Sequence, residues 1–174
     1  MRRTVWIAAA AFGVALGAAS AVAEQARGEM SGHMAPPGPD NRHVVDVPAH
    51  MRERMLANMR AQHEAVSEVM AALAAGDGAK AGKIADERLG VSSMGAAACK
   101  PGAASGAMGD MAAMMAKHMP DDMRAMGMTM HESASKFAET AKKIATGGDV
   151  KPALADLVAV MQNCAACHSA FRLK

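Results

Sequence analysis

The chain has 174 residues, and 19 Lys and Arg nearly balance 17 Asp and Glu, which gives a formal net charge of +2. Because this charge is small and the basic residues are not clustered with aromatic ones, the composition argues against nucleic-acid binding. Aromatic residues make up only 2% of the chain, so something else must fill the single core that a chain of this length can bury.

Residues 1–23 have the pattern of a cleavable secretory signal peptide. Arg2 and Arg3 precede an apolar stretch that ends in Ala21-Val22-Ala23. The stretch is rich in Ala and Gly and ends in small residues, which favours cleavage over retention as a membrane anchor. We therefore expect a periplasmic protein, exported by general secretion, that has no membrane span after the signal peptide is removed.

Residues 24–46 are rich in Gly, Pro and polar residues and show no apolar periodicity. Such a composition does not bury enough apolar surface to fold. We expect a flexible Pro/Gly-rich arm, followed by one domain over residues 47–174 whose first helix has Asp46 as its N-cap.

Apolar residues at three- and four-residue steps predict four helices in this domain. Between the second and third, residues 95–109 are rich in Ala, Gly and Ser and indicate a long connection. No segment alternates with a period of two residues. The sequence thus predicts an all-α four-helix bundle, an architecture that builds cofactor sites from side chains facing its core. The helices are expected between Asp46 and Gly76, from about Ala79 to Leu89, between Pro120 and Gly147, and from about Val150 to Phe171.

The last predicted helix carries a motif on its apolar face. Cys164-Ala165-Ala166-Cys167-His168 is the attachment signal of a c-type haem, because two thiols at this spacing can form thioether bonds to the haem and the histidine can bind its iron. A redox dithiol would call for a βαβ context, and a zinc site for further closely spaced ligands, and the sequence has neither. We expect one covalent haem c, whose porphyrin would replace aromatic side chains in the core. The apolar stripe comprises Leu154, Leu157, Val158, Met161, Cys164, His168 and Phe171.

With this motif on its last helix, the chain resembles the cytochromes c′ and the related c-556 type. These proteins are four-helix bundles whose haem motif lies near the C-terminus and is followed by an aromatic and a basic residue, here Phe171 and Arg172. Cys164 and Cys167 match the thioether positions, and His168 matches the proximal iron ligand.

The resemblance implies further residues near the haem. Arg172 matches a basic residue close to the haem, and a solvated arginine at the helix end is the alternative. Arg52 falls where the family has a basic residue, and Leu56 where it has the apolar group that covers the distal face. The six-coordinate relatives have a methionine ligand in this region, although core packing is the alternative for each methionine here. The candidates are Met55, Met59 and Met51, with His63 as a weaker one.

Two features depart from the family pattern. Residues 108–131 are unusually rich in Met and His, which bind cuprous copper, so a copper site including Met111, Met114 and Met115 is an alternative to core packing. Cys99 has no other cysteine near it in the sequence. Three interpretations of it stay open: an intermolecular bridge, a metal ligand or an unreactive thiol.

These observations predict a periplasmic monohaem cytochrome that transfers one electron to and from redox partner proteins. No catalytic constellation is visible, so we do not expect an enzyme. If only Leu56 and its neighbours close the distal face, the iron would instead be five-coordinate, and the resemblance then implies that it binds nitric oxide or carbon monoxide. A periplasmic copper-binding protein is the third hypothesis. Because family members often pair through their first two helices, the resemblance also implies a homodimer.

Overall fold

The computed structural model describes residues 38–100 and 107–174. Contacts between residues divide the chain into two units, residues 1–41 and residues 42–174, and the following description concerns the second. The predicted signal peptide at 1–23 and residues 24–37 of the predicted arm lie outside the described residues. Within the described part, no helix is long and apolar enough to cross a membrane.

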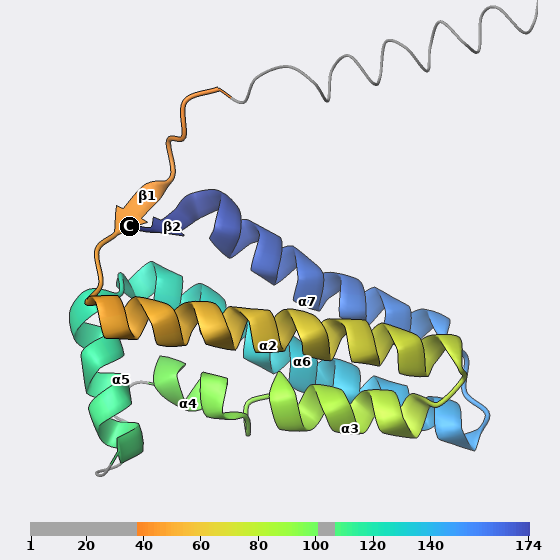
Figure 1. The fold of residues 1–174 in the computed structure, drawn as a ribbon. Coiled ribbons are helices and arrows are strands. Elements are labelled where there is room, and N and C mark those ends of the chain that lie inside the picture. The colour runs from red at the N-terminus through yellow and green to blue at the C-terminus, as the bar shows by residue number, and fades with distance from the viewer. Residues whose placement is uncertain (1–37, 101–106) are drawn as a thin grey trace, which may run out of the picture. The chain divides into compact units, whose positions relative to one another are not determined.

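The second unit is mostly α-helical, as predicted (Figure 1). Four helices correspond to the four that the sequence predicts, namely α2 (Ala49–Ala74), α3 (Gly78–Arg88), α6 (Asp121–Lys142) and α7 (Lys151–Ala170). A 3-10 turn over Lys143–Thr146 extends α6. Close contacts join α2 to α3, α3 to α6 and α6 to α7.

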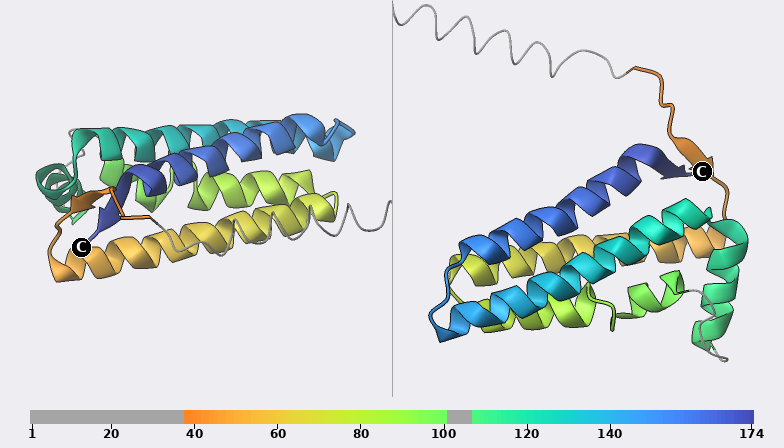
Figure 2. Two further views of the ribbon diagram at one scale, coloured as in Figure 1. Left: turned by 90° about the horizontal axis from the view of Figure 1, so that it is seen from above. Right: turned by 180° about the vertical axis from the view of Figure 1, so that it is seen from behind.

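Two further helices lie where the sequence indicated a long connection. The short helix α4 (Met94–Cys99) begins where the Ser93 hydroxyl accepts a hydrogen bond from the Ala96 amide, and α5 (Ala107–His118) follows. Ala and Met have high helix propensities, which outweigh the glycines of this region. Figure 2 shows α5 crossing one end of the long helices.

A pair of short strands joins the two ends of the second unit, which the sequence did not predict. Strand β1 (His43–Val45) pairs in parallel with β2 (Phe171–Leu173), and the His43 ring meets the Phe171 ring edge-on, with 5.8 Å between centroids. Three residues are too few to show a period of two. The residues around 43–45, expected to belong to the flexible arm, are therefore ordered, and Val45 is buried.

The predicted N-cap at Asp46 is wrong. The first long helix begins at Ala49, after Pro48, without a side-chain cap. The Asp46 carboxylate lies 3.3 Å from the Lys174 ammonium instead. This ion pair adds to the contacts between the start of α2 and the C-terminus.

The core has two parts. One, the alanine-rich core, consists of Ala65, Val66, Val69, Ala72, Leu73, Ala81, Ala85, Leu89, Met130, Ala134, Phe137, Ala138, Ala141, Ala153, Leu157 and Val160. The other, the methionine cluster, consists of Val45, Val47, Met51, Met55, Met119, Met123 and Phe171.

The buried face of α7 agrees with the predicted stripe at Leu157 and differs from it at Leu154 and Val158. Ala153, Leu157 and Val160 face the core, whereas Leu154 and Val158 are exposed. Sequence periodicity gives large side chains more weight, whereas several of the buried positions on these helices are alanines. The same applies to α2, where Leu56 and Met70 are exposed while Ala65 and Ala72 are buried.

Small residues also let α3 approach α6. A Cβ added at Gly82 would lie 2.8 Å from the backbone oxygen of Ala138, which is too close for van der Waals contact. We expect Gly82→Leu to lower the free energy of unfolding by about 1–3 kcal/mol, because the two backbones would have to separate. Denaturant titration measures this change.

Ala79→Leu is the matched control, since Ala79 lies on the same helix but is exposed. Its effect should stay within about 0.5 kcal/mol. Equal destabilisation by the two substitutions would contradict the close contact between α3 and α6.

Candidate functional site

The haem motif occupies the C-terminal end of α7, which ends at Ala170. Cys164 and Cys167 are free, partly buried thiols. Cys164 packs against the alanine-rich core and Cys167 against the methionine cluster. Burial raises the pKa of both thiols, and the nearby Cys164 and Asp122 raise that of Cys167 further. Both sulfurs are therefore held as neutral thiols at neutral pH.

Polar side chains between α6 and α7 fix the position of the motif. The Thr140 hydroxyl donates to the Asp156 carboxylate at 2.7 Å, and the Lys136 ammonium lies 2.9 Å from the same group. One residue before the motif, the Asn163 amide donates to the Ser133 hydroxyl at 2.9 Å. These contacts align antiparallel helices at two levels, so they fix the register of α7.

The end of the motif is held from the other side by the N-terminal part of the unit. Arg42 donates a hydrogen bond to the backbone oxygen of His168 at 3.2 Å. Arg52, at the start of α2, donates to the backbone oxygen of Lys174 at 2.8 Å. Together with the paired strands, these bonds hold the residues that follow α7 against α2.

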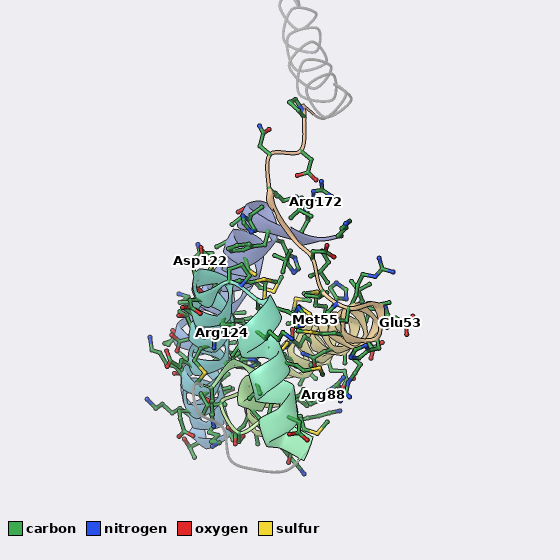
Figure 3. All side chains as sticks on the ribbon, turned by 90° about the vertical axis from the view of Figure 1, so that its left-hand side faces the viewer. Glu53, Met55, Arg88, Asp122, Arg124 and Arg172 are labelled. Carbon is green, nitrogen blue, oxygen red and sulfur yellow. The ribbon has the colours of Figure 1, made fainter. Side chains whose placement is uncertain are left out.

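A cavity of about 750 Å³ adjoins the motif, and Cys164, Cys167 and His168 all line it. Its volume lies in the range of small-molecule and cofactor sites. Methionines from five helices contribute to the wall, and in Figure 3 sulfur atoms gather around the labelled Met55. The lining methionines are Met51, Met55, Met59, Met94, Met115, Met119, Met123, Met126, Met130 and Met161.

The structure brings some of the predicted distal residues to this cavity and leaves others outside. Met51, Met55 and Met59 line it, as does the more exposed His63. Leu56 is 40% exposed and does not line the cavity, because the inward face of α2 passes through Met55 and Met59 instead. The apolar side chains that α2 presents to the cavity are therefore methionines, and Leu56 is not among them.

The two arginines that the resemblance placed near the haem are also not among the lining residues. Arg52 binds the C-terminal backbone, and Arg172 lies in β2, opposite Val44 of β1. Both therefore lie in the region where the two ends of the unit meet.

Sequence reasoning did not identify Asn58, Gln62 and Asn163, and it placed His131 only in the Met- and His-rich segment considered for copper. Asn58 and Gln62 of α2, His131 of α6 and Asn163 of α7 all line the cavity. His131 is only 2% exposed, and its Nδ1 lies 2.6 Å from the Leu89 backbone oxygen. The available signal was its place directly after Met130 on the apolar face of α6.

Cys99 also lines the cavity, half-buried at the end of α4. Burial raises the pKa of its thiol; the Arg124 guanidinium lowers it in part, and Cys167 raises it further. Across residues 38–100 and 107–174, no three His, Cys, Asp or Glu side chains are grouped so that they could hold a metal ion. Met114 and Met115 pack against the methionine cluster, and the side chain of Met111 lies outside the described part.

Comparisons of the chain with models of protein families, with curated protein sequences and with solved structures gave no significant match. The interpretation of the site therefore depends on the residues of this chain.

The α6–α7 contacts at Asp156 imply a pH dependence of stability. Burial would raise the pKa of this carboxyl, but the bonds from Lys136 and Thr140 outweigh it and lower the pKa. The charged form is thus favoured in the folded state, so its contribution is complete above the unfolded pKa of about 4 and is lost as the pH falls through the lower folded pKa. At neutral pH, Asp156→Asn should lower the free energy of unfolding by about 1–3 kcal/mol.

The difference between wild type and Asp156→Asn should shrink in urea titrations carried out at progressively lower pH. Glu139→Gln is the control, because the Glu139 carboxylate also pairs with a lysine, Lys142, but is fully exposed. Its removal should have no measurable effect on stability. A stability difference for Asp156→Asn that stays constant down to strongly acidic pH would contradict this account.

Proposed function

We propose that this chain is a periplasmic monohaem c-type cytochrome that transfers single electrons. In this proposal α2, α3, α6 and α7 form a four-helix bundle around one haem, which is attached to α7. One observation supports it above the others. The three motif residues that could hold a haem, Cys164, Cys167 and His168, line one cavity of about 750 Å³ whose wall is mainly apolar.

Each motif residue has a distinct role in this proposal. Cys164 and Cys167 hold the porphyrin through thioether bonds, and His168 binds the iron from one face. When bound, the haem supplies an iron that cycles between the ferrous and ferric states. The polar contacts of Asp156 and Asn163 keep α7 in register, so they position all three residues.

The wall of the cavity influences how easily an electron is gained. Methionine side chains exclude water and carry no charge, so they favour the iron state of lower net charge. The motif itself is accessible from outside, because Ala165, Ala166 and His168 are exposed. A redox partner protein can therefore approach α7 at the point of attachment.

A gas-binding protein is the second candidate, favoured by the size of the cavity beside His168. With no ligand on the second face of the iron, nitric oxide or carbon monoxide would bind there. Optical spectra of the reduced protein with and without carbon monoxide separate the two functions. No spectral change on adding the gas supports the electron carrier, and a complete change supports the gas binder.

Replacement of both motif cysteines tests the attachment. Cys164→Ala combined with Cys167→Ala should abolish the haem stain that persists on the wild-type protein in a denaturing gel, because no thioether bond can form. Cys99→Ala is the matched control, since it removes the third thiol of the same cavity and should leave the stain unchanged. Persistent staining of the double variant would refute covalent attachment at these residues.

A further inference from the structure

His131 is a buried histidine in the wall of the same cavity, and the proposed attachment does not use it. It lies on α6 and is 2% exposed, whereas His63, the other cavity histidine outside the motif, is exposed. A buried polar side chain is costly unless it is satisfied. The hydrogen-bond partners of His131 therefore indicate what its ring nitrogens can bind.

A hydrogen bond fixes the ring of His131. Its Nδ1 lies 2.6 Å from the Leu89 backbone oxygen. Because a carbonyl only accepts hydrogen bonds, Nδ1 carries the proton and Nε2 has the lone pair. Histidines that bind metals commonly donate their other ring N–H to a carbonyl or carboxylate, which sets the tautomer and the ring orientation.

The ring is also held neutral and in place. Burial lowers the pKa of His131; the bond to Leu89 partly offsets this, and Lys100 lowers the pKa further. Gly95 of α4 packs against the ring, since a Cβ there would lie 3.1 Å from His131 Cε1 and 3.2 Å from the Gln62 amide nitrogen. Gly95 and Gln62 therefore lie on the Cε1 side of the ring.

His131 lies at the same level along the antiparallel helices as the motif of α7. The bond between Ser133 and Asn163 aligns antiparallel α6 and α7, so His131 is level with Ala165, inside the motif. Its partner Leu89 directly follows α3, which packs against α2 and α6. The ring is thus bonded to the α3 side of the cavity, while His168 comes from α7.

We propose that His131 Nε2 is the second axial ligand of the haem iron, on the face opposite His168. This inference rests on the proposed function, because it presupposes a haem on α7. It assigns the second ligand to α6 rather than to the methionines of α2. Two imidazoles would close both faces of the iron, which favours electron transfer over gas binding, and would give a lower potential than a histidine and methionine pair.

Electron paramagnetic resonance and optical spectra of the ferric, haem-loaded full-length protein test this ligation. We expect a low-spin iron with two imidazole ligands and no methionine-to-iron charge-transfer band. His131→Leu should convert most of the iron to the high-spin form and allow the reduced protein to bind carbon monoxide. In His131→Ala, added imidazole should restore the low-spin signal by occupying the space of the ring.

Three further variants test the alternatives. His63→Leu and Met59→Leu should remain low-spin, and so should the control His50→Leu, whose histidine is exposed at the start of α2 and does not line the cavity. An unchanged low-spin spectrum in His131→Leu, or loss of the low-spin signal in His63→Leu or Met59→Leu, would overturn the assignment. If the His131 variants do not fold, the wild-type and His63→Leu spectra decide together: two imidazole ligands in both support His131, and a high-spin signal or a methionine band in the wild type excludes it. A wild-type protein without covalent haem would instead refute the proposed function.

Discussion

The volume enclosed by the long helices must be filled, and this chain has few aromatic side chains to fill it. Phe137 and Phe171 are the only aromatic residues in the described part, one in each part of the core. Around Phe137, Ala and Gly reduce the volume to be filled, because they let the helix backbones approach closely. Around Phe171, methionines line a cavity of about 750 Å³. The motif on α7 lies beside this cavity, and a porphyrin is a flat apolar group of the kind that such a space accommodates.

The position of α7 follows from the same division. Small residues let its N-terminal half pack against α6, and Asp156 and Asn163 fix its register. Its C-terminal half carries the motif past the cavity to β2, which pairs with β1. The cavity wall is not uniformly apolar, since His131, Asn58 and Gln62 meet around Gly95. This polar corner is why we assign the second iron ligand to α6.

The sequence was most informative where one residue type has one physical consequence. The spacing of Cys164, Cys167 and His168 identified the motif. The helix-breaking glycines Gly76 and Gly147 indicated the ends of long helices. Burial was harder to predict, because alanine packs at the closest contacts and leaves larger residues such as Val158 outside. The sequence placed His131 only in a Met- and His-rich segment, because the contacts of its ring with Leu89 and Gly95 form only when the chain folds.

We propose that one haem is bound covalently through the two thiols of α7. Intact-mass measurement of the denatured protein, isolated from the periplasm, tests it most directly, because denaturation removes any group that is bound only by contacts. We expect a chain that begins at Glu24 and carries the additional mass of one haem, located by peptide mapping on Cys164 and Cys167. A mass equal to that of the unmodified polypeptide, with both thiols free, would contradict it.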